Sequence, residues 1–380
     1  MDTMLAPDPI ELTRKLVASD TINPPGDEEW SARYLAQILS AAGFDVKLQR
    51  FGERRFNLVA KLAGAQGGKP LGFTGHLDTV PLGTVEWTHD AHGGEVADGR
   101  LYGRGSSDMK AGIAAFIVAC LPMIDTLRAS HGLQLILTGG EETGCDGAHA
   151  LTRAEPGMLE PLGALIVGEP TSNRVVVGHK GALWLRGTAR GVTAHGAMPQ
   201  EGVNAIYKVA EALRKIQQFE VGAAHPVMGA PTLNVGTIQG GLNINSVPDR
   251  AEFSVDMRTV PGIRHACVVD RLHDHLADIE LSPIIDLPPV YSDPEDSWIA
   301  RVSGLARARR GTDGASQAPC TVQFFTDAAV LSPATGHPPT IILGPGEPEM
   351  AHKTDEYCRV DRLLEAVDLY RDILIDWVAQ

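Results

Sequence analysis

The chain has 380 residues, of which 43% are hydrophobic and 21% are charged, and its formal net charge is -14. This length predicts two domains or one large one, and the hydrophobic content suffices for a packed core, which excludes a globally disordered chain. The excess of 47 acidic over 33 basic residues argues against a nucleic-acid or anionic-membrane partner, and without an apolar run of about 18 residues no membrane span is expected.

The first residues and the cysteines predict a cytoplasmic location. The start, MDTMLAPDPIEL, lacks the basic segment followed by an apolar stretch that characterises a secretory signal. The five cysteines are scattered and form no CxxC pair. This pattern is typical of a reduced protein rather than of a disulfide scaffold.

The first part of the chain predicts an α/β unit. Apolar residues recur at three- and four-residue spacing over 9–19 and 29–42, as in amphipathic helices, and 109–127 is apolar almost all round, as in an internal helix. Strands are expected at 44–51, 56–63, 71–80, 133–140 and 164–170. This alternation predicts an α/β fold with a mostly parallel, doubly wound sheet.

After about residue 178 the pattern changes. Strand, helix, strand, strand, helix and strand are expected at 182–191, 203–219, 232–241, 250–260, 264–279 and 281–287. This order is that of the ferredoxin-like α+β domain. A strand at 340–346 and a helix at 359–379 then return to the first pattern. We therefore expect residues 179–290 to be inserted into a discontinuous domain formed by 1–178 and 291–380.

Acidic and histidine residues lie at or near the ends of the predicted strands of the α/β domain. Ligands of an open parallel sheet gather at the carboxyl ends of its strands, so these side chains should converge on one crevice. His, Asp and Glu without thiolates are the donors that hold borderline or hard divalent metals. The candidates are His76, Asp78, Asp108, Glu141, Glu142, Glu169 and, near the C-terminus, His352.

Single motifs of this kind also have ordinary structural interpretations. A pair such as Glu141 and Glu142 is usually solvated surface, and a His-x-Asp such as His76 to Asp78 is seldom a metal site. Here, however, all the clusters have the same placement, and the two glutamates lie in a glycine-rich segment, TGGEETG. We expect Asp78 to share a strand face with His76 and to accept the second N–H of its imidazole.

The motifs GHLDTVP, GRLYGRGSSDMKAG, GGEETG, IVGEPT and AHKTDEY, in this order, resemble those of the dinuclear-zinc aminoacylase and carboxypeptidase family. That family includes acetylornithine deacetylase and succinyl-diaminopimelate desuccinylase, and the resemblance covers nearly the whole chain. It implies two divalent ions, most simply Zn²⁺ with Co²⁺ or Mn²⁺ as alternatives. In it, His76 and Glu169 bind one ion, Glu142 and His352 bind the other, and Asp108 bridges both.

The resemblance also implies catalytic roles. Glu141 would be the general base that activates a zinc-bound water, and Asp78 would support His76. The peptide bond after Asp108 is often cis in this family. The chemistry agrees, because amide hydrolysis needs a nucleophile, a Lewis acid and a proton carrier, and two adjacent glutamates can act as one ligand and one base.

Further site residues follow from the same resemblance. In the inserted domain, His195 would reach from the partner subunit of a homodimer to stabilise the oxyanion, although Gly196 stands where the family commonly has Ser. Taken alone, His195 would be a surface or core residue. Asn245 and Arg258 match positions that contact substrate, and Arg258 would pair with a substrate carboxylate. Weaker substrate candidates are the backbone N–H groups of Gly344 and Gly346, and Thr326.

The segments IVGEPTSNRVVVGHKG and GVNAI resemble acetylornithine deacetylases more than desuccinylases. We therefore expect a metal-dependent amidohydrolase that cleaves an N-acyl amino acid into an amino acid and a carboxylate. The alternatives are a succinyl-diaminopimelate desuccinylase, a dipeptidase or carboxypeptidase, and a non-catalytic amino-acid-binding relative. The presence of Glu141 beside a complete ligand set weighs against the last of these.

Overall fold

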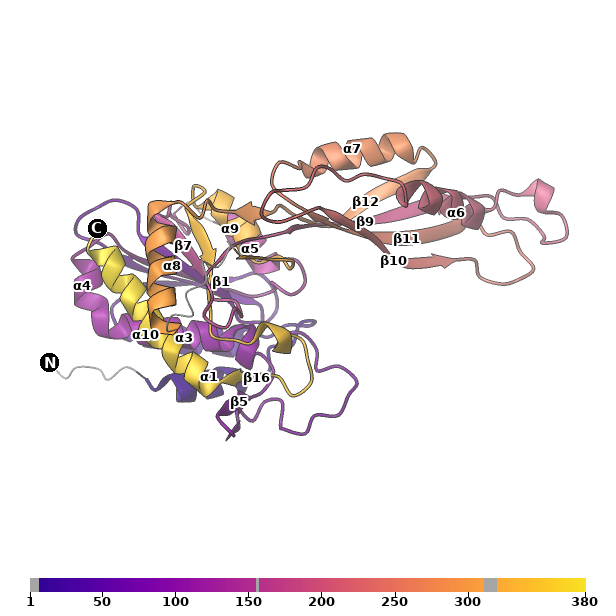
Figure 1. Ribbon diagram of the computed structural model, residues 1–380. Helices are drawn as coiled ribbons and strands as arrows, with labels where there is room; N and C mark the ends of the chain where they lie inside the picture. The colour runs from indigo at the N-terminus through magenta and orange to yellow at the C-terminus, as the bar shows by residue number, and fades with distance from the viewer. Residues whose placement is uncertain (1–6, 155–156, 311–319) are drawn as a thin grey trace. The chain divides into compact units, whose positions relative to one another are not determined.

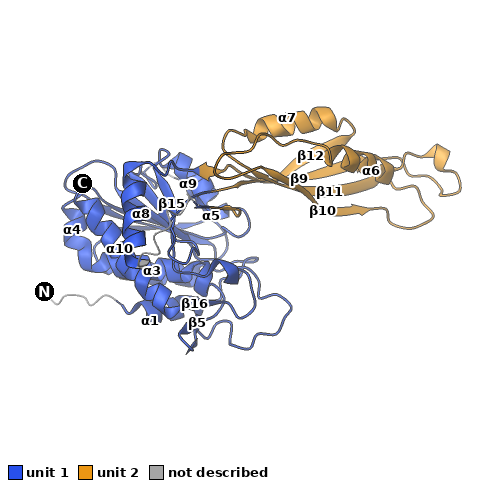
Figure 2. Cartoon of the chain, viewed as in Figure 1, with its two compact units in different colours: residues 1–178, 291–320, 326–380 blue, residues 179–290, 321–325 orange. Residues whose placement is uncertain are grey.

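The computed structural model describes residues 7–154, 157–310 and 320–380. The chain forms two compact units (Figure 2): unit 1 contains residues 1–178, 291–320 and 326–380, and unit 2 contains residues 179–290 and 321–325. The return of 321–325 to unit 2 differs from the expected boundaries. Residues 321–325 group with unit 2 because they contact its first strand segment, where the Lys180 N–H donates to the Val322 carbonyl.

Unit 1 is built on one large sheet (Figure 1), with the strand order β1-β2-β6-β3-β7-β15-β8-β13 and with β14 paired to β8. The neighbours β6, β3, β7 and β15 are parallel, whereas β1, β2 and β8 pair antiparallel. The predicted α/β fold with a mostly parallel centre is therefore confirmed. The strands are β1 (Asp45–Arg50), β2 (Phe56–Ala63), β3 (Leu71–His76), β6 (Gly132–Thr138), β7 (Ala164–Val167), β8 (Val176–His179), β13 (Val290–Tyr291), β14 (Cys320–Val322) and β15 (Thr340–Ile342).

Helices cover both faces of this sheet, and its central strands are therefore buried on both sides. In β6, Leu135 and Leu137 belong to the larger hydrophobic core, whereas the equally buried Ile136 points to the opposite face. The helices α5 and α9, which pack against each other, cover that opposite face. The helices are α1 (Pro9–Val17), α2 (Glu29–Ala41), α3 (Ala111–Cys120), α4 (Ile124–Arg128), α5 (Asp146–Thr152), α8 (Ser297–Arg310), α9 (Ala328–Ala334) and α10 (Val360–Val378).

The central helix α3 is buried along its whole length. The single helix expected at 109–127 is divided, because a short 3₁₀ turn containing Pro122 separates α3 from α4. The stretch Ser106–Arg128 is long and apolar enough to cross a membrane by length and composition alone. However, 67% of its most apolar window is buried inside the molecule, as in the core helix of a globular domain.

Unit 2 has the predicted ferredoxin-like order, with a four-stranded antiparallel sheet arranged β10-β11-β9-β12. Alternate residues of β11, including Phe253 and Met257, are buried with residues of α6 and α7 in a second core. Among residues 7–154, 157–310 and 320–380, the strand β10 pairs only with β11, so its other edge has no partner strand there. The elements are β9 (Gly181–Arg190), α6 (Ala205–Ile216), β10 (Thr232–Gly240), β11 (Arg250–Thr259), α7 (His265–His275) and β12 (Ile279–Leu287).

A small sheet of three short strands completes unit 1. Its order is β16 (Tyr357–Arg359), β5 (Arg100–Tyr102) and β4 (Val96–Ala97). Strands of two or three residues have too few positions to show a period, so the sequence did not predict them. This sheet joins the segment that precedes Asp108 to the segment that follows His352.

Candidate metal centre

The candidate ligands converge because the strands before them are parallel neighbours. His76 is the last residue of β3, Glu141 and Glu142 follow the end of β6, and Glu169 follows the end of β7. Because β6, β3 and β7 lie side by side and run in the same direction, their carboxyl ends meet at one edge of the sheet. Asp108 joins them from the turn that precedes α3.

Two groups of potential metal ligands form around one shared residue, with one ligand atom of each residue within 4.8 Å of the others. In the first group, His76 Nε2 lies 3.1 Å from Asp108 Oδ1 and 3.7 Å from Glu169 Oε1. In the second, His352 Nε2 lies 3.5 Å from Asp108 Oδ2 and 3.1 Å from Glu142 Oε2. Each oxygen of Asp108 therefore faces a different group, which is the geometry of a bridging carboxylate.

The chemistry of these residues fits a divalent cation. Imidazole nitrogens and carboxylate oxygens are ligands for Zn²⁺ and for related first-row metals. The Glu142 Oε1 atom is buried without a hydrogen-bond partner in the described part of the chain, as expected of a carboxylate whose natural partner is an ion. The first group is enclosed, with His76 at 2% exposure, whereas the His352 side chain is 56% exposed.

Charge interactions shift the pKa values of these groups in opposite directions. Burial alone would raise the pKa of Asp108, but hydrogen bonds with His352 and His76 hold it below its usual range. Hydrogen bonds with Asp108 and Glu142 raise the pKa of His352 to about 10, and burial raises that of Glu169 to about 8. Protonated imidazoles thus balance the crowded carboxylates, a task that bound cations would take over.

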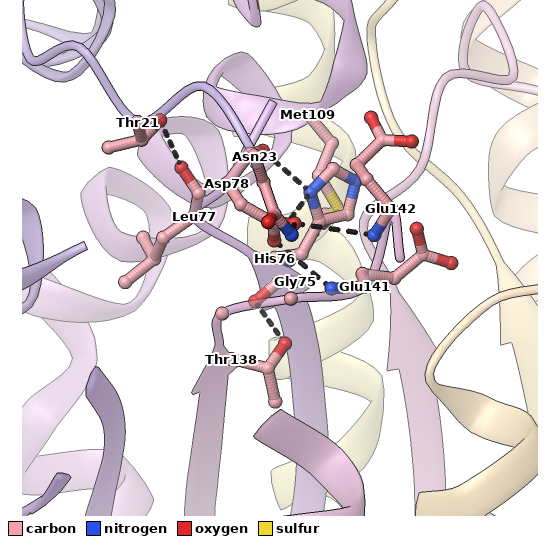
Figure 3. Close-up of polar contacts among 12 residues, drawn as sticks. Thr21, Asn23, Gly75, His76, Leu77, Asp78, Met109, Thr138, Glu141 and Glu142 are labelled. Carbon is pink, nitrogen blue, oxygen red and sulfur yellow. Dashed lines mark hydrogen bonds and ion pairs between the residues drawn. The ribbon is translucent and has the colours of Figure 1, made fainter. Parts of the chain in front are cut away.

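Asp78 does not make the contact expected from the sequence. His76 Nδ1 lies 2.9 Å from the main-chain oxygen of Asp78 but 3.6 Å from its carboxylate. That carboxylate instead accepts hydrogen bonds from the backbone N–H groups of Glu141 and Glu142 and from Asn23 (Figure 3). The reason is that β3 ends at His76, so strand alternation does not extend to Asp78. The Asp108–Met109 peptide bond is cis.

Glu141 lies beside the two ligand groups and belongs to neither of them. Glu141 is 6% exposed. Burial raises the pKa of Glu141 well above its usual value, and the charges of Glu169, Glu142 and Asp327 raise it further, whereas the charge of His76 lowers it. Adjacent glutamates are thereby placed in different environments.

Two of the weaker substrate candidates have structural partners instead. The Gly344 N–H donates to Thr171 Oγ1 at 3.1 Å, so it is not free for a substrate. The fully buried Thr326 uses its hydroxyl to accept the Ala328 N–H at the start of α9. Gly346 is required by close packing, because a Cβ there would lie 2.2 Å from the Ser107 carbonyl oxygen.

The remaining candidates lie in unit 2. His195 is exposed, and its Nδ1 accepts the Ala197 N–H at 3.1 Å. The Gly196 N–H donates to the main-chain oxygen of Asn245, and a Cβ on Gly196 would lie 2.9 Å from that oxygen, which explains the absence of Ser there. Asn245 itself is exposed.

Arg258 already has a carboxylate partner in its own strand. Its Nε lies 2.9 Å from Asp256 Oδ1, its Nη2 donates to Asp256 Oδ2 at 3.1 Å, and its guanidinium lies over the Trp184 ring. The Trp184 indole N–H also donates to Asp256. Asp256 thus occupies the edge of the Arg258 guanidinium formed by Nε and Nη2. Nη1 lies at the other edge, which we call the outer edge.

Sequence reasoning missed two buried polar residues that support the site: Asn23 donates to Asp78, and Glu356 binds the loop before Asp108. Asp327, which the sequence placed near the site together with Thr326, accepts a hydrogen bond from Thr138 at the end of β6. Glu356 lies in the quoted AHKTDEY motif, but an acidic residue in a loop carries no periodic signal that would distinguish it from a solvated one.

The whole chain is similar to known proteins. A model of "Peptidase family M20/M25/M40" matches residues 72–376. A probable succinyl-diaminopimelate desuccinylase from Staphylococcus epidermidis is 31% identical and covers 98% of each chain. An acetylornithine deacetylase from Proteus mirabilis is 32% identical, over 92% of this chain and 91% of its own. An M20 family metallo-carboxypeptidase structure from Sulfolobus solfataricus matches with a TM-score of 0.82 at 17% identity, over 98% of this chain and 100% of its own.

Proposed function

Because the chain belongs to peptidase family M20/M25/M40 and is a hydrolase acting on amide bonds, we propose that it cleaves an N-acylated amino acid, in the manner of an acetylornithine deacetylase. The observation that supports this most is the pair of ligand groups that share Asp108, with Glu141 beside them and outside both. The products are an amino acid and a carboxylate.

In this proposal the ligands are His76 and Glu169 on one side, Glu142 and His352 on the other, and Asp108 between them. The nitrogen and oxygen donors favour Zn²⁺, with Co²⁺ and Mn²⁺ as alternatives. Two such ions, when bound, polarise the amide carbonyl and make water acidic enough to be deprotonated near neutral pH.

The role proposed for Glu141 is to carry a proton. Its carboxylate takes a proton from the attacking water and delivers it to the leaving amine nitrogen as the C–N bond breaks. Asp78 supports this step through the hydrogen bond from the Glu141 N–H to its carboxylate at 3.2 Å, which fixes the main chain of the base. The low exposure of Glu141 keeps bulk water from exchanging that proton.

A second candidate is the desuccinylase reaction, because the two relatives with different names are almost equally identical to this chain. The deciding experiment uses purified protein loaded with Zn²⁺, Co²⁺ or Mn²⁺ in separate samples. N-acetyl and N-succinyl amino acids and dipeptides are compared by kcat/KM. Turnover of the N-acetyl compounds above the others supports the deacetylase proposal, and no hydrolysis of any amide by a metal-loaded sample contradicts it.

We also propose that the chain forms a homodimer through unit 2. In the part of the chain that the structure describes, no strand pairs with the edge of β10 that faces away from β11, and several large apolar side chains of unit 2 are exposed. Unpaired strand edges and apolar patches are features of protein interfaces, and twofold pairing is the commonest arrangement. The most exposed of these apolar residues are Tyr207, Ile238, Leu242 and Ile244, the last two at 98% and 104%.

In this dimer, His195 of one subunit would stabilise the oxyanion that forms on the substrate bound by the other. An exposed imidazole whose Nδ1 is already fixed by the Ala197 N–H presents Nε2 as its free donor. Arg258 would bind the substrate carboxylate through its outer edge, and Asn245 would contact the substrate nearby in unit 2.

A further inference from the structure

Glu356 is a fully buried carboxylate with both oxygens in use. Its Oε1 accepts the backbone N–H groups of Ser107 at 2.8 Å and of Asp108 at 3.0 Å. Its Oε2 accepts Arg104 Nη1 at 2.7 Å and the Gly105 N–H at 3.0 Å. Four donors therefore converge on one side chain, which is about the full acceptor capacity of a carboxylate.

These bonds hold the loop that carries Asp108. The backbone N–H groups of Gly105, Ser107 and Asp108 all donate to this one carboxylate. The main chain of the loop is therefore fixed as far as the α-carbon of Asp108. Asp108 has non-helical φ and ψ angles of -118° and 91°, so no helix hydrogen bond defines its orientation. The orientation of its carboxylate therefore depends on the glutamate behind it.

The same residue ties this loop to the segment of His352, which precedes Glu356 by four positions. Arg104 Nη1 also donates to the Lys353 carbonyl at 3.2 Å, and the Ser107 hydroxyl donates to the Tyr357 carbonyl at 2.7 Å. Asp108 and His352 are thus fixed relative to each other by contacts that lie outside both ligand groups.

Arg104 completes the arrangement by balancing the buried charge of Glu356. It is 1% exposed, and its guanidinium lies 5.1 Å from the centre of the Trp87 ring. The Arg104 guanidinium and three backbone N–H groups together stabilise the buried charge of the Glu356 carboxylate. A neutral side chain without these acceptor oxygens would leave several of the donors without a hydrogen bond.

We propose that Glu356 is a positioning residue of the metal centre, which sets the bridging geometry of Asp108 and its separation from His352. This inference rests on the proposed function only in taking Asp108 and His352 as ligands. Glu356 itself touches neither an ion nor the substrate. Its effect is transmitted through the main chain of Asp108, as with other groups that orient metal ligands through a second layer of hydrogen bonds.

The substitution Glu356→Gln tests the role of the carboxylate with almost no change in volume. In this variant an NH₂ group replaces one of the two carboxylate oxygens, and it would face two hydrogen-bond donors. Either the Ser107 and Asp108 pair or the Arg104 and Gly105 pair therefore loses its acceptor. We expect the affinity for Zn²⁺ to fall by about 10–100-fold, measured by competition with a chromogenic chelator on metal-free protein. The absorption spectrum of the Co²⁺ form should also change, because the coordination geometry changes.

The matched control is Glu28→Gln. Glu28 is equally buried and pairs with an arginine, Arg55, at 2.9 Å, but its carboxylate accepts no backbone N–H of a proposed ligand. This variant should lose thermal stability while retaining the wild-type Zn²⁺ affinity and Co²⁺ spectrum. A loss of stability alone therefore does not reproduce the predicted result.

Glu356→Asp is the second variant, and it decides the question if Glu356→Gln does not fold. It keeps the charge but is one methylene shorter, so it can reach only one of the two donor pairs and should also bind Zn²⁺ more weakly than the wild type. Wild-type affinity and an unchanged Co²⁺ spectrum in the folded Gln or Asp variant would overturn the proposal. These readouts need no turnover, so a wild-type protein that binds metal but hydrolyses no amide would contradict the proposed function and leave the role of Glu356 standing.

Discussion

At the scale of single residues, the site depends on which atom of each side chain is already in use. Asp108 has one oxygen toward each ligand group, and Glu142 faces His352, whereas Glu141 belongs to neither group. The predicted strand ends placed Glu141 and Glu142 among the candidates, whereas the ligand roles of Asp108 and His352 were implied by the family resemblance. It could not predict the contacts of Asp78, because those depend on β3 ending at His76.

The ion pair between Arg258 and Asp256 leads to a prediction about substrate binding. Asp256 occupies the Nε and Nη2 side of the guanidinium, which orients the outer edge for a substrate carboxylate. In Asp256→Asn, the support is weakened, and KM for an N-acyl amino acid should rise roughly 10-fold with little change in kcat, since about 1.4 kcal/mol is a reasonable loss for a charged hydrogen bond. The measurement is steady-state kinetics.

The control for this variant is the same substrate with its carboxylate converted to a carboxamide. That compound cannot form the ion pair with Arg258, so its KM should be insensitive to Asp256→Asn. An equal rise in KM for both compounds would show that Asp256 does not act through carboxylate recognition.

At the scale of helices and strands, long periodic segments were predicted well and short ones were not. The strand expected at 56–63 is β2, Phe56–Ala63, in which only Asn57 and Lys61 interrupt the apolar residues. The short strands β4, β5 and β16 were missed, and so was α8, in which Arg301 and Gly304 interrupt the few buried apolar residues. The missed small sheet joins the segment that precedes Asp108 to the segment that follows His352.

Close packing of the connections gives a prediction for Gly344. A Cβ at this position would lie 2.3 Å from the Gly168 carbonyl oxygen and 2.6 Å from that of Glu169. Gly344→Ala should therefore displace the turn that carries Glu169, with a loss of about 1–3 kcal/mol in unfolding free energy and weaker metal binding. Both are measured, by denaturant unfolding and by chelator competition.

Gly304 provides the comparison, because nothing lies within 4 Å of a Cβ built there and it is inside α8. Gly304→Ala should raise the unfolding free energy by about 0.5–1 kcal/mol through helix propensity. If Gly344→Ala instead raises the unfolding free energy as Gly304→Ala does, the close packing of the turn after β15 against Glu169 is not important for the site.

At the scale of the whole molecule, stability should depend on metal and on pH together. Glu169 has a pKa of about 8 in the folded metal-free chain, above its ordinary value, so from about pH 4.5 to 8 the folded state holds a proton that the unfolded state has lost. The stabilising contribution of His352, whose pKa is about 10, is complete below about pH 6.5 and is lost as the pH rises toward 10. Both effects make the metal-free protein less stable as the pH rises.

Bound cations replace these protons, so the stabilisation by metal should grow with pH. At 100 times the dissociation constant, a ligand that binds only the folded state contributes about 2.7 kcal/mol. We expect the difference in Tm between Zn²⁺-loaded and metal-free protein to be larger at pH 8.5 than at pH 5.5, by calorimetry. A difference that is zero, or that shrinks as the pH rises, would contradict the assignment of these residues as ligands.

The proposed dimer is tested by mixing two inactive variants. Glu141→Ala and His195→Ala homodimers should each be nearly inactive. After co-refolding at a 1:1 ratio, half of the dimers are mixed, and if His195 acts on the partner's substrate each mixed dimer has one intact site, so about a quarter of all sites recover with statistical assortment. No recovery, with mixed dimers verified by mass, would rule out action between subunits.

The central claim is that Glu141 carries the proton while Glu142 holds metal, and the most direct test measures both properties in both variants. Glu141→Ala should retain two equivalents of Zn²⁺ by elemental analysis while turnover of an N-acyl amino acid falls by about 10²–10⁴-fold. Glu142→Ala should lose affinity for one of the two ions. The opposite pattern, in which Glu141→Ala loses zinc and Glu142→Ala retains both ions and full activity, would contradict the account.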